Sequence, residues 1–406
     1  MALSQRARGI QPSATLAMDA RAKELVRSGV DVISFGAGEP DFPTPFPAKE
    51  RAITAIRENF THYTPSAGIP ELRQAVAEKL QNENGVEYSP EQIVITAGAK
   101  HALYMLFQCL LDPGDQVLVP APYWVSYVEQ VRMAGGEPVI VPARAEDGFR
   151  PRPEDLEKAV TPRTRALILN SPNNPTGAVY PRDRLEQIAA FALRHGLLVV
   201  SDEIYEHLIF GQAEHVSIAS LGPEIKAHTV IINGVSKTYA MTGWRIGYAA
   251  ADDTALIKAM VNWQSHSTSN ATSISQWAAL AALTGDQSQL GSMRAEFLQR
   301  RDYMVQRLQR IPGVRCPMPE GAFYAFPDVS QLFGRRWPGQ NAYPERVIHS
   351  SRDLAELLLE VGKVAVVPGE AFGEPRCLRL SYATSMENIL KGLDRMEAVI
   401  KRLVDA

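Results

Sequence analysis

From about residue 90 onward, short apolar runs alternate regularly with helix-like stretches along this chain. Several of the runs are apolar at every position, as expected of strands that are buried on both faces of a sheet. Helix-like stretches lie between them at 100–111 and at 182–195, and the second shows apolar residues at helical spacing. This alternation predicts an α/β fold built on a mainly parallel, seven-stranded sheet. The seven strands are expected at 92–96, 116–120, 138–142, 165–170, 197–203, 229–234 and 245–250.

The two ends of the chain follow a different pattern. Residues 1–40 indicate one amphipathic helix and then a turn-rich segment, and after about residue 290 a long charged helix is followed by short strands. We therefore expect a large domain over residues 45–290 and a smaller α+β domain built from residues 1–44 and 291–406. The cleft between two such domains is the expected place for a ligand.

Composition narrows the possible partners. The chain has 42 basic and 45 acidic residues, a net charge of −3, so neither nucleic acid nor an anionic membrane surface is an expected partner. No apolar run approaches the roughly 18 residues that cross a bilayer, and we expect no signal peptide. The three cysteines, Cys109, Cys316 and Cys377, form neither a disulfide framework nor a zinc spacing, which favours a cytoplasmic protein. Motifs for NAD, ATP or catalytic zinc are absent from the sequence, so no metal is expected.

Polar side chains follow three of the predicted strands, at the edge where open α/β sheets bind ligands. Asn174 lies in the turn SPNNPTG, Asp202 and Tyr205 belong to SDEIY, and Lys237 lies in NGVSKTYAMTGWRIGY. Partial burial would lower the pKa of Lys237 and make its amine a nucleophile toward a carbonyl. Each residue also has a purely structural interpretation: a turn for Asn174, a helix cap for Asp202 and a surface position for Lys237.

A turn of small residues precedes another predicted helix. In TAGAKHALYML, Gly98 and Ala99 link a strand to the helix that begins near Lys100. The backbone N–H groups at such a helix start suit a phosphate. A Gly-Ala turn before a helix is also common without any ligand, so this motif alone does not decide between the two interpretations.

Together these segments resemble the fold-type I aminotransferases, which use pyridoxal 5′-phosphate. SPNNPTG, SDEIY and SKTYAMTGWRIGY occur in that order, and the resemblance covers nearly the whole chain. It extends to the segments AGEPDF, HYTPSAGIPELR, GAK, PYWVSY and RLSYATS. The pattern is most similar to the bacterial aspartate aminotransferases called class Ib. The resemblance implies that the large domain binds the cofactor and that the small domain closes over the substrate.

The resemblance also implies a role for each matching residue. Lys237 would bind the cofactor covalently and, once displaced by substrate, move the substrate proton. Asp202 would keep the ring nitrogen protonated, while Tyr205 and Asn174 would bind the ring oxygen. Tyr63 would reach the phosphate from the neighbouring subunit, which implies a homodimer with shared active sites. The other cofactor contacts implied are Gly98, Ala99, Lys100, Trp124, Ser236 and Arg245.

The same resemblance places the substrate. Its α-carboxylate would meet Arg379, with the backbone N–H of Gly38 helping from the other side. Arg376 is the alternative arginine, and Arg379 is preferred because it matches the family position in RLSYA. Trp124 and Asn174 would complete the substrate contacts.

The residues for a distal carboxylate favour acidic substrates. The segment NWQSHSTSNATS contains no arginine where other aspartate aminotransferases carry one. Class Ib members instead use a lysine and a threonine, which this chain keeps as Lys100 and Thr15. Gln11 stands where sequences that also accept prephenate often carry a lysine, so prephenate is not an expected substrate.

We therefore expect an enzyme that moves the amino group of aspartate, or of another acidic amino acid, to 2-oxoglutarate through a pyridoxamine phosphate form. The alternatives on the same fold are an aromatic, kynurenine or methionine aminotransferase and a β-lyase. A cofactor-binding regulator without turnover is the alternative from another class, and it is disfavoured because regulators of this type usually carry an added DNA-binding domain.

Overall fold

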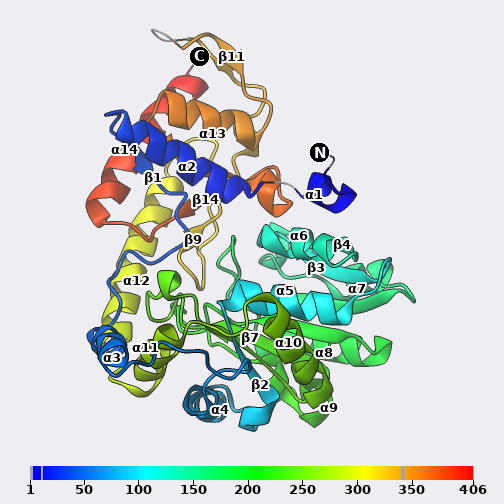
Figure 1. The fold of residues 1–406 in the computed structure, drawn as a ribbon. Coiled ribbons are helices and arrows are strands. Elements are labelled where there is room, and N and C mark those ends of the chain that lie inside the picture. The colour runs from blue at the N-terminus through cyan, green and yellow to red at the C-terminus, as the bar shows by residue number, and fades with distance from the viewer. Residues whose placement is uncertain (1–2, 11, 340–342, 406) are drawn as a thin grey trace.

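The computed structural model describes residues 3–10, 12–339 and 343–405. Its centre is a seven-stranded sheet with the strand order β2-β8-β7-β6-β5-β3-β4 (Figure 1). Strand β8 runs antiparallel to both of its neighbours, and the other strands run parallel to one another. The predicted α/β class and the mainly parallel sheet are confirmed. The strands are β2 (Ile93–Thr96), β3 (Gln116–Ala121), β4 (Glu137–Pro142), β5 (Thr164–Asn170), β6 (Leu198–Asp202), β7 (Thr229–Gly234) and β8 (Gly247–Ala251).

Helices cover both faces of this sheet, because successive apolar side chains on each strand point to opposite faces. On β3, Val117 and Val119 pack toward one helix layer and Leu118 packs toward the other. The first layer consists of α5 (Ala99–Leu110), α6 (Ser126–Met133) and α10 (Thr254–Ser267). The second layer consists of α3 (Phe46–Arg57), α4 (Pro70–Asn84), α7 (Pro153–Ala159), α8 (Arg182–His195), α9 (Pro223–Ala227) and α11 (Ser273–Thr284).

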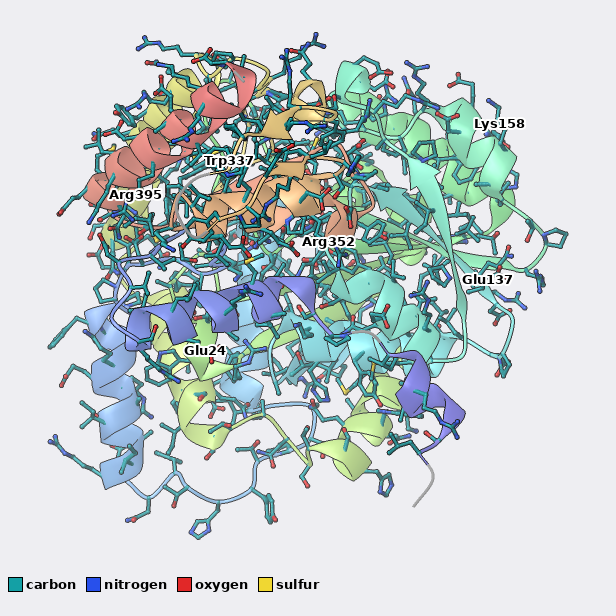
Figure 2. The ribbon with its side chains drawn as sticks, turned by 90° about the horizontal axis from the view of Figure 1, so that it is seen from above. Glu24, Glu137, Lys158, Trp337, Arg352 and Arg395 are labelled. Carbon is teal, nitrogen blue, oxygen red and sulfur yellow. The ribbon has the colours of Figure 1, made fainter. Side chains whose placement is uncertain are left out.

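A second hydrophobic core lies beside the sheet and joins the two ends of the chain. Near its N-terminal end the chain pairs β1 (Ile33–Ser34) in parallel with β12 (Val364–Ala365). Figure 1 shows the C-terminal helices above the sheet, and Figure 2 shows Trp337 and Arg395 on the side away from Glu137 and Lys158. The elements that form this core are α12 (Ser288–Leu308), β9 (Tyr324–Ala325), α13 (Ser351–Glu360), β14 (Leu378–Ser381) and α14 (Met386–Val404). Helix α2 (Ala14–Arg27) packs beside it against β1, β12 and β13 (Val367–Pro368).

Two local predictions were wrong. The single helix expected within residues 1–40 is divided into α1 (Gln5–Gly9) and α2, with Pro12 between them, where a proline ring disfavours a continuous helix. The strand expected from residue 245 begins only at Gly247, because Arg245 has a left-handed backbone with φ 57° and ends a tight turn. The remaining short elements are η1 (Pro90–Gln92), η2 (Ala145–Asp147), η3 (Ile218–Leu221), η4 (Thr242–Trp244), η5 (Ser330–Leu332), β10 (Arg336–Trp337), β11 (Arg346–Val347) and η6 (Gly369–Phe372).

The fold leaves two other predictions open. Within the described part of the chain, no helix combines the length and apolar character that crossing a membrane requires. The cytoplasmic location itself stays a prediction. The domain boundaries predicted at residues 44/45 and 290/291 also stay a prediction.

Helix α14 allows a matched test of the second core. Leu393 is 0% exposed and Leu390 is 40% exposed on the same helix. We expect Leu393→Ala to lower the free energy of unfolding by about 2–5 kcal/mol, because it leaves a cavity in the core. Leu390→Ala should cost less than about 1 kcal/mol. Urea unfolding followed by circular dichroism measures both changes, and equal losses would contradict the packing described here.

Candidate active site

A cavity of about 450 Å³ lies where the parallel strands β5, β6 and β7 end against the second core. Lys237 and Asp202 line it from the sheet, and Gly38 and Arg379 line it from segments of the second core. The structure therefore brings together residues that are up to hundreds of positions apart in the sequence. The predicted site residues that line this cavity are Thr15, Gly38, Ala99, Lys100, Trp124, Asn174, Asp202, Tyr205, Ser236, Lys237, Arg245 and Arg379.

Two predicted residues do not line the cavity. Tyr63 is 87% exposed and lies between α3 and α4, so nothing in a single chain brings it to the site. Gly98 lies just behind the cavity wall and precedes α5. The alternative Arg376 lines a different cavity and pairs with Glu374 at 2.9 Å, so the geometry favours Arg379 at this site.

Lys237 lies in the turn between β7 and β8, and its half-buried side chain extends toward the N-terminal segment. Its Nζ donates a hydrogen bond of 2.5 Å to the carbonyl oxygen of Gly38. Burial lowers the pKa of Lys237 to about 8, Glu39 opposes this shift, and Arg245 and Arg379 add to it. About a tenth of the amine is therefore uncharged at pH 7, and this fraction can act as a nucleophile or a base.

Asp202 is the last residue of β6 and is 3% exposed. The hydroxyl of Tyr127 donates to its Oδ2 at 2.6 Å, and the backbone N–H of Ile204 donates to its Oδ1 at 3.2 Å. Burial raises the pKa of Asp202 to about 6, and both hydrogen bonds lower it. The carboxylate is therefore mainly ionised at pH 7, inside a cavity that it shares with Lys237.

The start of α5 and the turn before β8 form a place for an anion. Gly98 has φ 86°, and a Cβ atom there would lie 2.4 Å from Nη2 of Arg245. Glycine is thus required for the arginine to approach the helix start so closely. Ser236 and Ala99 line the cavity at the same turns. Backbone N–H groups at a helix N-terminus together with a guanidinium are suited to a phosphate.

Arg379 is a buried cation, 2% exposed, on β14. Its Nη1 donates to Oδ1 of Asn174 at 3.0 Å, and its Nη2 donates to the carbonyl oxygen of Gly36 at 2.8 Å. Its Nε has no hydrogen-bond partner in the described part of the chain. The guanidinium stacks over Tyr324 at 4.5 Å from the ring centroid. A buried arginine without a carboxylate partner and with a free donor is suited to bind a ligand carboxylate.

Two tyrosine side chains join the sheet side of the site to the second core: Tyr205 follows β6, and Tyr324 lies on β9. The hydroxyl groups of Tyr205 and Tyr324 lie 3.0 Å apart, and burial raises the pKa of Tyr205 well above its usual range. Tyr205 therefore stays a neutral hydrogen-bonding group at physiological pH. The backbone N–H of Asn174 donates to Oδ1 of Asn170 at 2.9 Å, which fixes the turn after β5 beside these phenols.

The cavity carries an excess of positive charge. Within the described residues, seven charged side chains line it, five basic and two acidic. The net charge of the whole chain is −3, so this basic character is local. A cavity with this charge favours a ligand that carries several negative groups. The basic residues are Lys23, Lys100, Lys237, Arg245 and Arg379, and the acidic residues are Glu39 and Asp202.

Several residues of the site were not predicted, among them Tyr127, Tyr324, Glu39 and Asn170. Tyr127 binds Asp202, Tyr324 binds Tyr205, Glu39 lies near Lys237, and Asn170 holds the turn after β5. Tyr127 had a usable signal, because it lies three positions after Trp124 at helical spacing in PYWVSY. The contacts of Tyr324 and Glu39 join distant segments and carry no comparable local signal, whereas Asn170 lies only four positions before Asn174.

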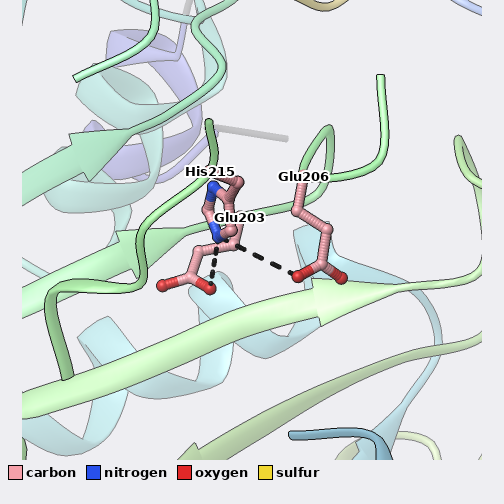
Figure 3. A group of neighbouring side chains, drawn as sticks. All are labelled: Glu203, Glu206 and His215. Carbon is pink, nitrogen blue, oxygen red and sulfur yellow. Dashed lines mark hydrogen bonds and ion pairs between the residues drawn. The ribbon is translucent and has the colours of Figure 1, made fainter. Parts of the chain in front are cut away.

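A buried polar cluster lies next to Asp202. Figure 3 shows His215 facing the carboxylates of Glu203 and Glu206, with its Nε2 at 3.1 Å and 3.9 Å from their oxygens. Although three such groups can hold a metal ion, Glu206 also forms an ion pair with Lys79. Asn84 donates to Glu206 as well, at 2.7 Å. We interpret the cluster as an ion-pair network that fixes the chain directly after β6.

Comparisons with known proteins agree with this geometry. A family profile described as aminotransferase class I and II matches residues 30–396. The aspartate aminotransferase of Geobacillus stearothermophilus is 50% identical over 99% of this chain and 98% of the relative. The aspartate/prephenate aminotransferase of Thermus thermophilus is 48% identical over 98% of this chain and 99% of the relative.

Solved structures match over the same extent. An aspartate aminotransferase from Thermus thermophilus with maleate matches with a TM-score of 0.91 and 46% identity, over 98% of this chain and 100% of that one. An aspartate aminotransferase from Rhizobium meliloti matches with a TM-score of 0.94 and 43% identity, over 99% of each chain. With a family match over most of its length and a cavity that combines a reactive lysine, a buried carboxylate and anion-binding groups, this chain belongs to the class I and II aminotransferases.

Proposed function

We propose that this protein is an aspartate aminotransferase that uses pyridoxal 5′-phosphate to move the amino group of aspartate to 2-oxoglutarate. One observation carries the proposal. Lys237, a half-buried lysine whose pKa is lowered to about 8, lies in one cavity with the buried Asp202 and with the basic residues Arg245, Arg379 and Lys100. This combination provides a nucleophile for an aldehyde and separate places for a ring nitrogen, a phosphate and carboxylates.

The cavity fits the cofactor by the chemistry of its groups. Gly98 lets Arg245 approach the start of α5, which suits the phosphate. Asp202 is a buried carboxylate that suits a protonated ring nitrogen, and Trp124 offers an aromatic face to the ring. When bound, pyridoxal phosphate supplies an electron sink for the carbanion formed at the substrate Cα.

The residues of the chain supply the nucleophile, the base and the contacts that hold the cofactor ring. The uncharged amine of Lys237 would bind the cofactor aldehyde and, once released, would take the proton from the substrate Cα. The carbonyl oxygen of Gly38 holds this amine in place through the hydrogen bond at its Nζ. Asp202 would keep a proton on the ring nitrogen, and the neutral phenol of Tyr205 would bind the phenolic oxygen of the ring.

The substrate is held at both ends. Nε of Arg379 is the free donor for the α-carboxylate, while its two Nη atoms are already held by Asn174 and Gly36. Lys100 and Thr15 line the cavity and would bind the distal carboxylate. We infer that residues 1–44 and 291–406 close over the bound substrate and exclude water, which strengthens these contacts.

The names of the relatives support aspartate as the amino donor. Relatives from Geobacillus, Bacillus subtilis and Streptomyces avermitilis, 47–50% identical, are named aspartate aminotransferases. The matching Thermus structure contains maleate, a dicarboxylate. Prephenate is a second candidate substrate, because relatives from Aquifex aeolicus and Thermus thermophilus carry it in their names. Gln11, whose identity disfavoured prephenate, lies outside the described residues.

We also propose a homodimer with shared active sites. The side chain of Tyr63 is 87% exposed in the single chain, and it does not line the cavity of that chain. Phe46, Ile56 and Phe60, close to it in sequence, expose large apolar side chains as well. Several large exposed apolar side chains in one stretch of the chain support a surface for another protein chain.

Lys237 gives the first prediction. The rate of covalent attachment of pyridoxal phosphate should rise with pH through a midpoint of about 8, because only the uncharged amine reacts. Stopped-flow absorbance measures the rate, and borohydride reduction with peptide mapping should place the label on Lys237.

Two substitutions test the same assignment. Glu39→Gln should move the midpoint lower, since Glu39 raises the pKa of Lys237. Lys237→Ala should lower turnover by at least about 10²–10⁴-fold. A label on another lysine, or a midpoint near the usual 10.4, would refute this assignment.

The substrate proposal is tested at Lys100. Lys100→Ala should lower kcat/KM for aspartate. The loss should correspond to about 2–5 kcal/mol of transition-state stabilisation, the cost of leaving a desolvated charge unpaired. The value for phenylalanine should change little or improve. Lys100→Arg keeps the charge and serves as the control, with most aspartate activity retained. An equal loss for both amino acids would mean that Lys100 serves the cofactor, and higher kcat/KM for phenylalanine than for aspartate in the unchanged protein would overturn the proposed function.

Shared active sites are tested with purified heterodimers. A dimer of one Tyr63→Phe subunit and one Lys237→Ala subunit retains one intact site if Tyr63 acts on the partner. A dimer of one unchanged subunit and one double-variant subunit retains none. Pyridoxal phosphate should therefore bind the lysine-bearing site about ten- to a hundredfold more tightly in the first heterodimer, as expected for one hydrogen bond to a charged group. Equal dissociation constants, or a fully active monomer in sedimentation, would rule out sharing.

A further inference from the structure

Tyr127 is a buried residue that touches two groups of the site at once. It lies in the first turn of α6 and is 1% exposed. Its hydroxyl donates to Oδ2 of Asp202 at 2.6 Å. Its ring packs edge-on against Trp124, with ring centroids 5.4 Å apart and an interplanar angle of 85°. One side chain therefore fixes both the carboxylate and the indole that line the cavity.

The hydrogen bond completes the coordination of the carboxylate. Oδ1 of Asp202 accepts from the backbone N–H of Ile204, so Oδ2 depends on Tyr127. Within the described residues these two groups are the only hydrogen-bond donors to the carboxylate, and neither is a cation. A buried carboxylate with neutral donors is held in position by them, and losing one of two leaves an oxygen without a partner.

The surrounding charges act on the carboxylate in both directions. Burial raises the pKa of Asp202 to about 6, and Glu203, next in the chain, also raises it. Lys237, from the turn after β7, lowers it, as does the hydrogen bond from Tyr127. The phenol of Tyr205 lies close enough to Asp202 that the two interact electrostatically. Tyr127 and Lys237 both favour the ionised form of Asp202, and of the two only Tyr127 forms a hydrogen bond with the carboxylate.

We propose that Tyr127 is a positioning residue that holds Asp202 ionised and aimed into the cavity, and that it thereby sets how tightly the ring nitrogen of the cofactor is bound. The proposal deepens the proposed function and rests on it. The contact is local to the hydroxyl group, so Tyr127→Phe removes the hydrogen bond and leaves the ring against Trp124. The edge-on packing of the two rings therefore should survive this substitution.

The direct test measures the carboxyl group itself in the full chain without added cofactor. Infrared titration, with the Asp202→Asn protein subtracted, isolates the Asp202 signal. Tyr127→Phe should move the midpoint of protonation upward by about one to two pH units, the shift expected for losing a hydrogen bond to a charged group. Tyr382→Phe removes another buried phenol, 0% exposed, whose hydroxyl donates to the carbonyl oxygen of Ala322, and it should leave the midpoint unchanged. An unchanged midpoint in Tyr127→Phe, or equal shifts in both variants, would overturn the proposal.

A double-mutant cycle on pyridoxal phosphate binding provides a second measurement. At neutral pH, Tyr127→Phe should raise the dissociation constant about tenfold or more in the Asp202 protein but leave it nearly unchanged in the Asp202→Asn protein. Equal factors in both backgrounds would show a merely structural role and overturn the proposal. The proposed function fails separately, if the unchanged protein binds pyridoxal phosphate without transaminating any amino acid.

A third measurement needs no substitution at Tyr127, should that variant not fold. In protein labelled with ¹³C at the tyrosine Cζ, Asp202→Asn should shift the resonance of a buried tyrosine other than Tyr205, because the hydroxyl of Tyr127 loses its carboxylate acceptor. The spectrum of Tyr205→Phe protein identifies the Tyr205 resonance, which Asp202 also influences. Absence of any such shift would overturn the proposal.

Discussion

The burial of the central sheet on both faces is the constraint on which the rest of this structure depends. Helices cover the sheet from both sides, so a polar side chain on a central strand can leave the core only where the strand ends. Asn170 and Asp202 are the last residues of β5 and β6, and Lys237 follows β7 within three positions. The carboxyl ends of parallel strands share one edge, which gathers these groups without any need for proximity in sequence.

Desolvation then gives the gathered groups their reactivity. The same burial lowers the pKa of Lys237 to about 8 and raises that of Asp202 to about 6, so the two groups approach neutral pH from opposite sides. Arg379 is buried without a carboxylate partner in the described chain and keeps a free donor, an arrangement that costs free energy unless a ligand compensates it. The ion-pair network around Glu206 lies just behind, where it holds the chain between Asp202 and the second core.

Features of the fold and the site that depend on neighbouring residues were predictable from the sequence, and contacts between distant segments were not. The strands and the positions of Asp202 and Lys237 were predictable, because apolar runs and the residues directly after them lie together in the sequence. Tyr127 and Asp202 are 75 positions apart, and Tyr205 and Tyr324 are 119 apart, so their contacts depend on the packing of whole elements. The turn at Arg245 was predicted as strand, since its left-handed backbone leaves no mark in an apolar pattern. The position of Tyr63 relative to a site needs a second chain, which no single sequence describes.

The antiparallel course of β8 has a consequence for ligand choice. Because β8 returns directly from β7, and Gly247 pairs with both Gly234 and Thr96, one hairpin carries Lys237 on its outgoing side and Arg245 on its return, next to the start of α5. The spacing of the backbone at Lys237 and Arg245 is therefore set by the connection between β7 and β8, and a ligand that contacts both side chains must match it.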